Sequence, residues 1–197
     1  IRLSLVGSEM CIRDRGILVE HYIISSGLRE IIEGTAIAKY FTHIYASSFY
    51  YNEHGEPCWP AQVINYTNKT QFLFRIEKGI LDINDNAVND HFAEGELRVP
   101  FRNIVYIGDS ATDIPCMRLV NSLGGHSIGV YDSENTASKD TVRRMIRDER
   151  IRYYVPADYT KGSEMDILIH RIIDKTAAYE VLEGKHLRDR KEAIGLK

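Results

Sequence analysis

Two aspartates follow a short apolar run near the middle of the chain, at a spacing that suits a divalent cation. Residues 103–107 are typical of a buried strand, and Gly108 permits a tight turn directly after it. Asp109 then stands at the strand end, and Asp113 lies four residues later in a predicted helix. Two carboxylates at one crevice repel each other unless a cation lies between them, and oxygen-only ligands favour Mg²⁺ over zinc. An aspartate in a turn followed by an aspartate that caps a helix gives the same spacing, so both interpretations stay open here.

Two further polar segments have the composition of an anion site. Ser25, Ser26 and Gly27 follow a β-branched run and precede a predicted helix, so a hydroxyl and backbone N–H groups are available to a phosphate. Lys69 lies at the start of another predicted helix, where a cation opposes the helix dipole. Its ammonium group would neutralise a phosphate and a carboxylate. The ordinary alternatives are a surface turn for the serines and a solvated side chain for Lys69.

The elements around these positions alternate between strands and helices. Strands are predicted over residues 19–24, 43–46, 103–107, 127–131 and 152–155, a hairpin over 49–59, and helices over 28–32, 37–41, 67–79, 112–120, 136–146 and 164–179. This order predicts an α/β fold, with a parallel sheet that is flanked by helices on both faces. Sites in such sheets form at the carboxyl ends of the strands, where both Ser25 and Asp109 are expected.

Taken in order, the three segments resemble the haloacid dehalogenase (HAD) superfamily of hydrolases. The strand-end Ser25, the helix-start Lys69 and the segment Gly108-Asp109-Ser110-Ala111-Thr112-Asp113 are similar to its second, third and fourth motifs. Residues 23–28 are similar to the second motif of the phosphoserine-phosphatase-like branch. The resemblance implies a Rossmann-like sheet and a Mg²⁺-dependent phosphatase that acts on a small-molecule phosphate ester.

The resemblance also implies a role for each matching residue. Asp109 would bind Mg²⁺ directly, and Asp113 would support the ion from further out or through water. Ser25, helped by the Ser26 N–H and the Gly27 turn, would bind the transferring phosphoryl group, while Lys69 would stabilise its charge. Members of the family attack with the first aspartate of an Asp-x-Asp motif and form an aspartyl-phosphate. The attack is possible because the positive charges of the site neutralise the phosphoryl group.

No Asp-x-Asp motif precedes Ser25 in this sequence. Residues 5–15 instead match, at eleven consecutive positions, the translation of a transposon-end adapter used in sequencing libraries. We therefore expect residues 1–15 to be a non-native tail and residues 16–180 to be a partial HAD-like core that lacks its first strand. Residues 181–197 are expected to form a charged tail that frays. The chain as given is then an inactive piece of a larger hydrolase.

The bulk composition agrees with a soluble cytoplasmic enzyme domain. Hydrophobic residues make up 44% and charged residues 27%, and the formal net charge of −3 argues against nucleic acid or a membrane as partner. Cys11, Cys58 and Cys116 share no metal-ligand spacing and are expected to be free thiols in a reducing compartment. Two alternatives are a non-catalytic HAD-like binding module and a receiver-type signalling domain, although a receiver would carry its acidic residues first and its lysine last.

Overall fold

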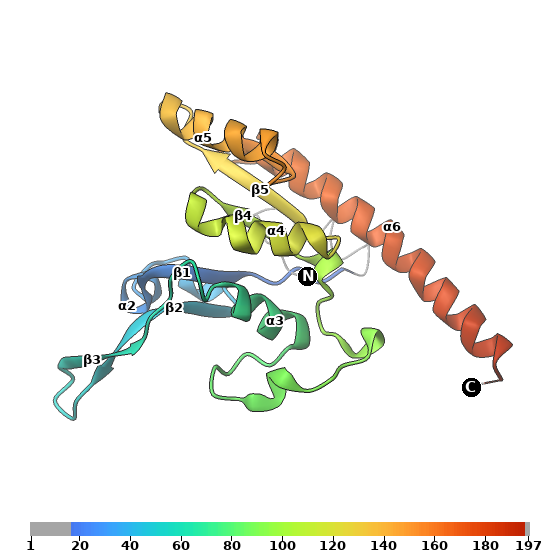
Figure 1. Ribbon diagram of the computed structural model, residues 1–197, viewed down its shortest axis with the longest axis horizontal. Coiled ribbons are helices and arrows are strands. Elements are labelled where there is room, and N and C mark those ends of the chain that lie inside the picture. Colours follow the sequence, from blue (N-terminus) through green and yellow to red (C-terminus); the bar gives the residue numbers. More distant parts are fainter. Residues whose placement is uncertain (1–16, 196–197) are drawn as a thin grey trace. The chain divides into compact units, whose positions relative to one another are not determined.

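The computed structural model describes residues 17–195, which fall into two compact units that divide after Ala157 (Figure 1). The expected non-native tail, residues 1–15, lies outside the described residues. The described chain is mixed α/β, as predicted, and none of its helices is long and apolar enough to cross a membrane.

The first unit contains all the described strands and most of the helices. Its strands are β1 (Tyr22–Leu28), β2 (His43–Tyr51), β3 (Pro57–Gln62), β4 (Val105–Gly108), β5 (His126–Tyr131) and β6 (Tyr153–Pro156). Its α-helices are α2 (Arg29–Glu33), α3 (Thr70–Lys78), α4 (Ile114–Ser122) and α5 (Thr136–Arg147). Its 3₁₀ helices are η1 (Ala38–Tyr40), η2 (Asn86–Asn89), η3 (Glu94–Glu96), η4 (Phe101–Asn103) and η5 (Ala111–Asp113).

The described strands form two three-stranded sheets rather than one. The first has the order β1-β2-β3, with β1 and β2 parallel, and the second has the order β4-β5-β6 and is wholly parallel. Among the described residues, β1 pairs only with β2 and β4 pairs only with β5. One hydrophobic core nevertheless lies beneath both sheets, because Tyr22 and Ile24 of β1 pack against the cluster that contains Tyr106 of β4.

The strand β2 continues beyond β1 into a hairpin, as the sequence predicts (Figure 1). Its second half pairs antiparallel with β3, and Asn52 organises the connecting loop by accepting hydrogen bonds from the backbone N–H groups of His54 and Glu56. Asparagine suits this position because its side-chain oxygen can accept hydrogen bonds from backbone N–H groups of the turn that follows it.

The helix α3 ends where the sequence predicts and begins slightly later. Gly79 closes it in the left-handed conformation, with φ 75°, and its N–H bonds back into the last turn. The sequence predicts a start at residue 67, with Thr67 or Asn68 as the cap, and the structure does not place the cap at either residue. Lys69 itself occupies the N-cap position, while the Asn68 side chain accepts a hydrogen bond from Asn65 N–H and so stabilises the preceding turn.

The second unit consists chiefly of helix α6 (Glu164–Ala193). The Ser163 side chain caps it by accepting a hydrogen bond from Asp166 N–H. We expected the helix to end near residue 179 and the tail to fray, but the helix continues to Ala193. Residues such as Lys185 and Asp189, which form an i,i+4 ion pair, explain how this charged stretch supports a helix.

Candidate functional site at the carboxyl end of β4

The side chain of Asp113 is the centre of a buried polar cluster where β4 leads into α4. Its Oδ1 accepts hydrogen bonds from Lys69 Nζ at 2.8 Å and from the Tyr106 hydroxyl at 2.9 Å. Its Oδ2 accepts one from the Ser110 hydroxyl at 3.0 Å. The side chains of Lys69 and Asp113 are only 7% and 9% exposed. The sequence predicted that Lys69 and Asp113 share a crevice, and the structure places them in direct contact.

The turn before α3 fixes the position of Lys69. Asn68 Nδ2 donates to the Val63 carbonyl at 2.9 Å, and Asn68 Oδ1 accepts from Asn65 N–H at 2.8 Å. These bonds hold the backbone on both sides of the turn, so the chain enters α3 with Lys69 at the N-cap position. A lysine at this position is disfavoured by the helix dipole, and the Asp113 carboxylate offsets that cost.

Gly108 is required by the close approach of Asp113 rather than by a special backbone conformation. A Cβ at this position would lie 2.8 Å from Asp113 Cβ, Cγ and Oδ2. Gly108 is also absent from the glycines with positive φ, so the tight turn expected from the sequence is not the reason for it. The missing side chain makes room for the buried carboxylate.

Replacing Gly108 with alanine should therefore destabilise the protein by about 1–3 kcal/mol, the usual cost of overpacking. Asp113 is held by three donors and is too short to swing aside. The matched control is Gly95→Ala, because a Cβ there has no atom within 4 Å and the backbone φ is not positive. Urea unfolding followed by circular dichroism measures both variants. Equal midpoints for the two would show that Asp113 relaxes freely and that the cluster is loosely held.

Tyr106 and Ser110 are members of the cluster that sequence reasoning missed. Tyr106 is two residues before Gly108 on β4, so its side chain lies on the same face of the sheet as the space that Asp113 fills. This i,i+2 relation was the signal in the sequence that could have identified it. Burial raises the pKa of Tyr106, with Cys116 and Asp113 adding to the effect, so the hydroxyl stays protonated and donates to Asp113.

Cys116 lies against the same cluster from α4. It is fully buried, and burial raises the pKa of its thiol to about 11. Cys58, by contrast, is exposed, and both cysteines are free thiols, as predicted. The predicted free thiol Cys11 lies outside the described residues. A neutral Cys116 thiol beside a neutral Tyr106 hydroxyl leaves Lys69 and Asp113 as the charged pair within the buried cluster.

Asp109 differs from Asp113 in every respect that matters for binding a cation. It is exposed, and its carboxylate has no hydrogen-bond or ion-pair partner in the described part of the chain. Asp113 has about four acceptor positions, of which three are taken by Lys69, Tyr106 and Ser110. Direct ligation therefore suits Asp109, whereas Asp113 fits a supporting role.

This donor set fits Mg²⁺ as part of a site. Magnesium commonly takes one or two carboxylates and keeps several waters, so Asp109 would be its ligand from this chain. Within residues 17–195, no group of three His, Cys, Asp or Glu side chains gathers to hold a metal ion by itself.

The predicted anion-binding segment, residues 25–27, lies within the last residues of β1 and not in a turn after the strand, so that part of the prediction was wrong. The pairing of β1 with β2 shifts register over this segment, between Ile24 and Leu28. Ser25 Oγ accepts a hydrogen bond from Gly27 N–H at 3.0 Å, which leaves its own proton available to an acceptor. The Ser26 carbonyl accepts from the Ser47 hydroxyl at 3.2 Å, and Ser26 and Gly27 are exposed. Among the described residues, no hydrogen bond or ion pair joins this segment to Lys69 or Asp113, whereas Lys69 and Asp113 are bonded to each other.

Lys78, the last residue of α3, is bonded to the loop that follows the helix. Its Nζ donates to the carbonyls of Val88 at 2.7 Å and Asp90 at 2.8 Å. Arg75, one turn earlier on α3, is buried and donates to the carbonyls of Asp82, Ile83 and Asp85. The carboxyl end of α3 is therefore bonded to the loop over residues 82–90, while Lys69 caps its amino end.

Comparison with known proteins gives one distant relative and no family assignment. The chain is 26% identical, over 164 residues, to an uncharacterized protein of Borreliella burgdorferi. The match includes 75% of this chain and 55% of the relative, so the chain spans about half the length of that protein. No family model matches the sequence.

Proposed function

We propose that the chain is part of a Mg²⁺-dependent hydrolase of the HAD superfamily, most closely related to its phosphoserine-phosphatase-like branch. The full-length parent would cleave a small phosphomonoester through an aspartyl-phosphate intermediate. The aspartate that forms this intermediate is not in the present sequence, so the chain by itself would be inactive.

The observation that carries this proposal is the buried Lys69–Asp113 pair next to the exposed Asp109. Burying an ion pair is a poor way to gain stability, since apolar replacements are often neutral or more stable by about 1–4 kcal/mol. A lysine and a carboxylate held at the carboxyl end of a parallel strand therefore favour a functional reason. Positioning a fixed positive charge beside a metal-binding carboxylate is what phosphoryl transfer requires.

Each residue at the site would then have a distinct task. Asp113 orients the Lys69 ammonium, which offsets negative charge on the phosphoryl group. Asp109 provides one carboxylate to the cation, and the cation when bound would withdraw charge from the phosphoryl oxygens. Ser25 donates a hydrogen bond to the phosphoryl group, assisted by the backbone of Ser26.

The purified chain should not hydrolyse p-nitrophenyl phosphate in the presence of Mg²⁺, because it lacks the attacking aspartate. The measurement is release of p-nitrophenolate at several protein concentrations, with the full-length parent as the positive control. Turnover by the chain that disappears in Asp109→Asn would refute our account of the missing segment. A full-length parent that is folded but inactive on all phosphate esters would favour the non-catalytic binding module instead.

A further inference from the structure

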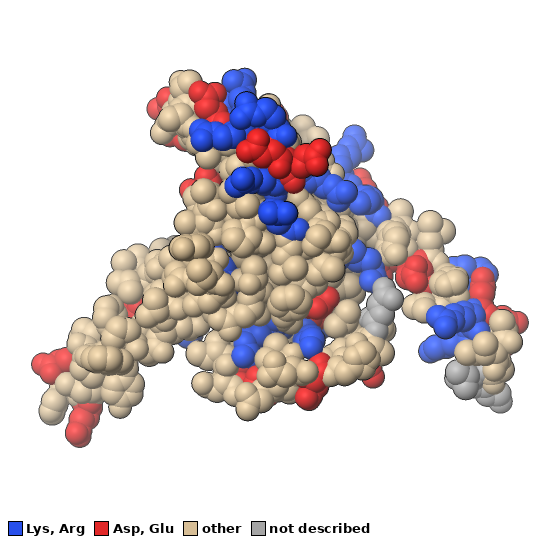
Figure 2. All heavy atoms as spheres, in the orientation of Figure 1, with Lys and Arg blue, Asp and Glu red and all other residues tan. Residues whose placement is uncertain are grey.

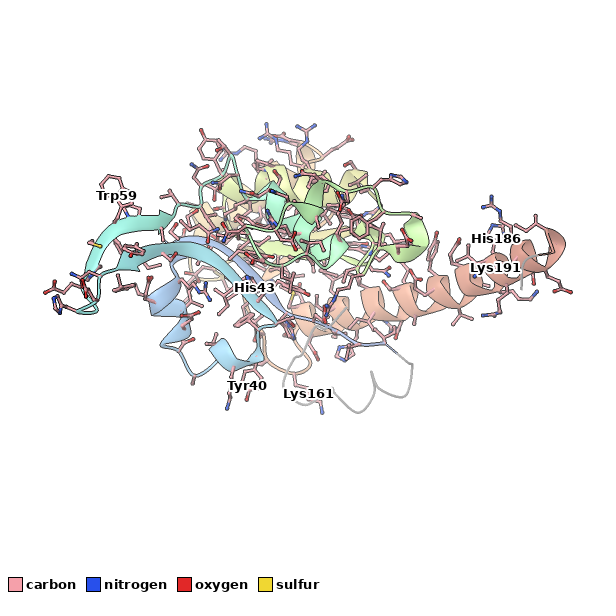
Figure 3. The ribbon with its side chains drawn as sticks, turned by 90° about the horizontal axis from the view of Figure 1, so that it is seen from below. Tyr40, His43, Trp59, Lys161, His186 and Lys191 are labelled. Atoms are coloured by element: carbon pink, nitrogen blue, oxygen red, sulfur yellow. The ribbon has the colours of Figure 1, made fainter. Side chains whose placement is uncertain are left out.

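The hairpin formed by residues 48–62, here called the aromatic hairpin, exposes large rings that the core does not cover. Tyr50 and Trp59 lie directly opposite each other on β2 and β3, so they project from the same face. Tyr50 is 62% exposed and Trp59 is 73% exposed. Figure 3 shows Trp59 on the hairpin, directed away from the ribbon. Tyrosine and tryptophan are enriched at interfaces, and neighbouring exposed rings form the kind of apolar patch that marks a binding surface.

The edge of the aromatic hairpin is unsuited to pairing with another strand. Pro57 and Pro60 stand opposite Tyr51 and Phe49 on β3, and neither proline has an N–H to donate. Figure 2 shows an uncharged surface along the hairpin that ends in acidic side chains, and both Glu53 and Glu56 at the tip are exposed. Added strands and polyanions are therefore poor occupants, and the faces of the rings are the surface that remains.

The base of the aromatic hairpin is joined to both halves of the candidate site. The Ser47 hydroxyl donates to the Ser26 carbonyl and accepts from Ile64 N–H at 3.0 Å. The returning strand then leads through the Asn65–Asn68 turn to Lys69. Tyr50 is three residues beyond Ser47, which at about 3.3 Å per residue gives a reach of roughly 10 Å from Ser26.

We propose that Tyr50 and Trp59 stack on the base of a nucleoside monophosphate whose phosphate lies at the exposed backbone of Ser26. A sugar separates phosphate from base in such a molecule and matches the reach along the hairpin. The inference rests on the proposed function for the position of the phosphate, while the stacking rests on the hairpin alone. Aromatic stacking tolerates any base, so the proposal names the class of substrate and not one nucleotide.

The test uses Trp59 as its own reporter, because the chain has a single tryptophan. The full chain is titrated with adenosine 5′-monophosphate, adenosine and ribose 5-phosphate while Trp59 emission is recorded. We expect saturable quenching by the monophosphate, weaker binding of adenosine and no quenching by ribose 5-phosphate. Tyr50→Ala should weaken binding of the monophosphate about tenfold, within the range for loss of one base–aromatic stack. Tyr40→Ala is the matched control, since Tyr40 is 51% exposed and lies outside the hairpin.

The outcomes separate the two proposals. Equal affinity for adenosine and its monophosphate would retain the stacking but remove the phosphate site, which contradicts the proposed function. Binding of ribose 5-phosphate and the monophosphate with equal affinity in calorimetry, without any change in Trp59 emission, would leave the phosphate site intact and overturn the stacking. Absence of binding by all three ligands would also overturn it.

Discussion

Lys69→Ala and Asp109→Asn should each lower kcat/KM of the full-length parent by at least about 10²-fold. Loss of one group that stabilises charge in a transition state typically costs about 2.7–4 kcal/mol. Lys69 Nζ is held 2.8 Å from Asp113 Oδ1, so no other side chain of α3 can replace it. The measurement is phosphatase kinetics at saturating Mg²⁺, with the folded fraction of each variant checked by circular dichroism.

The matched control for this experiment is Lys78→Ala on the same helix. Lys78 is nine residues from Lys69, roughly 13 Å along the helix at 1.5 Å per residue, so both cannot touch one phosphate. Its substitution should change kcat/KM by less than about threefold, although losing the bonds to Val88 and Asp90 should lower stability. A reversed order, with Lys78→Ala severely impaired and Lys69→Ala near wild type, would overturn the assignment.

The second large effect concerns stability and needs only the present chain. Lys69→Met should destabilise it by about 3–5 kcal/mol, because it leaves the buried Asp113 carboxylate without its counter-charge. Adding Asp113→Asn to Lys69→Met should recover part of this loss, since an amide carries no charge to compensate. In the wild-type background, the same Asp113→Asn change should be destabilising.

An exposed pair provides the control for this cycle. Arg29 and Glu33 form an i,i+4 ion pair at 2.7 Å, and their side chains are 44% and 48% exposed. Arg29→Met should cost less than about 1 kcal/mol. Urea unfolding yields all four free energies. If Lys69→Met costs no more than Arg29→Met, the buried pair is not a significant constraint on the fold.

The sequence predicted those parts of the structure that depend on local patterns. The β4 strand, the Gly79 stop and the loop of the aromatic hairpin all follow from residue types within a few positions of one another. The contact between Lys69 and Asp113, 44 residues apart, came from the resemblance to a motif order, not from periodicity. Tyr106 was missed because a tyrosine in an apolar strand usually serves only in packing. The sequence does not show that its hydroxyl donates a hydrogen bond to Asp113.

Other differences came from tertiary contacts that a pattern cannot show. Lys78 looks like a surface lysine in the sequence, yet it bonds to two carbonyls ten and twelve residues later. The division into two sheets was not predicted. The apolar residues of β1 and β4 predict that both segments are strands, but they do not show which strands are their neighbours in a sheet. Helix α6 continues beyond the end of its apolar pattern, to Ala193. Charged side chains four residues apart stabilise a helix even where no face of it is buried.

The short helix α3 also has a mechanical consequence. Its N-cap is Lys69, and Arg75 and Lys78 near its other end donate five hydrogen bonds to backbone carbonyls of residues 82–90. A helix of nine residues is stiff over its roughly 13 Å length, so the two ends move together. The loop and the Lys69 ammonium group are therefore attached to opposite ends of one stiff helix. A displacement of that loop would be transmitted to the Lys69 ammonium group and to its hydrogen bond with Asp113.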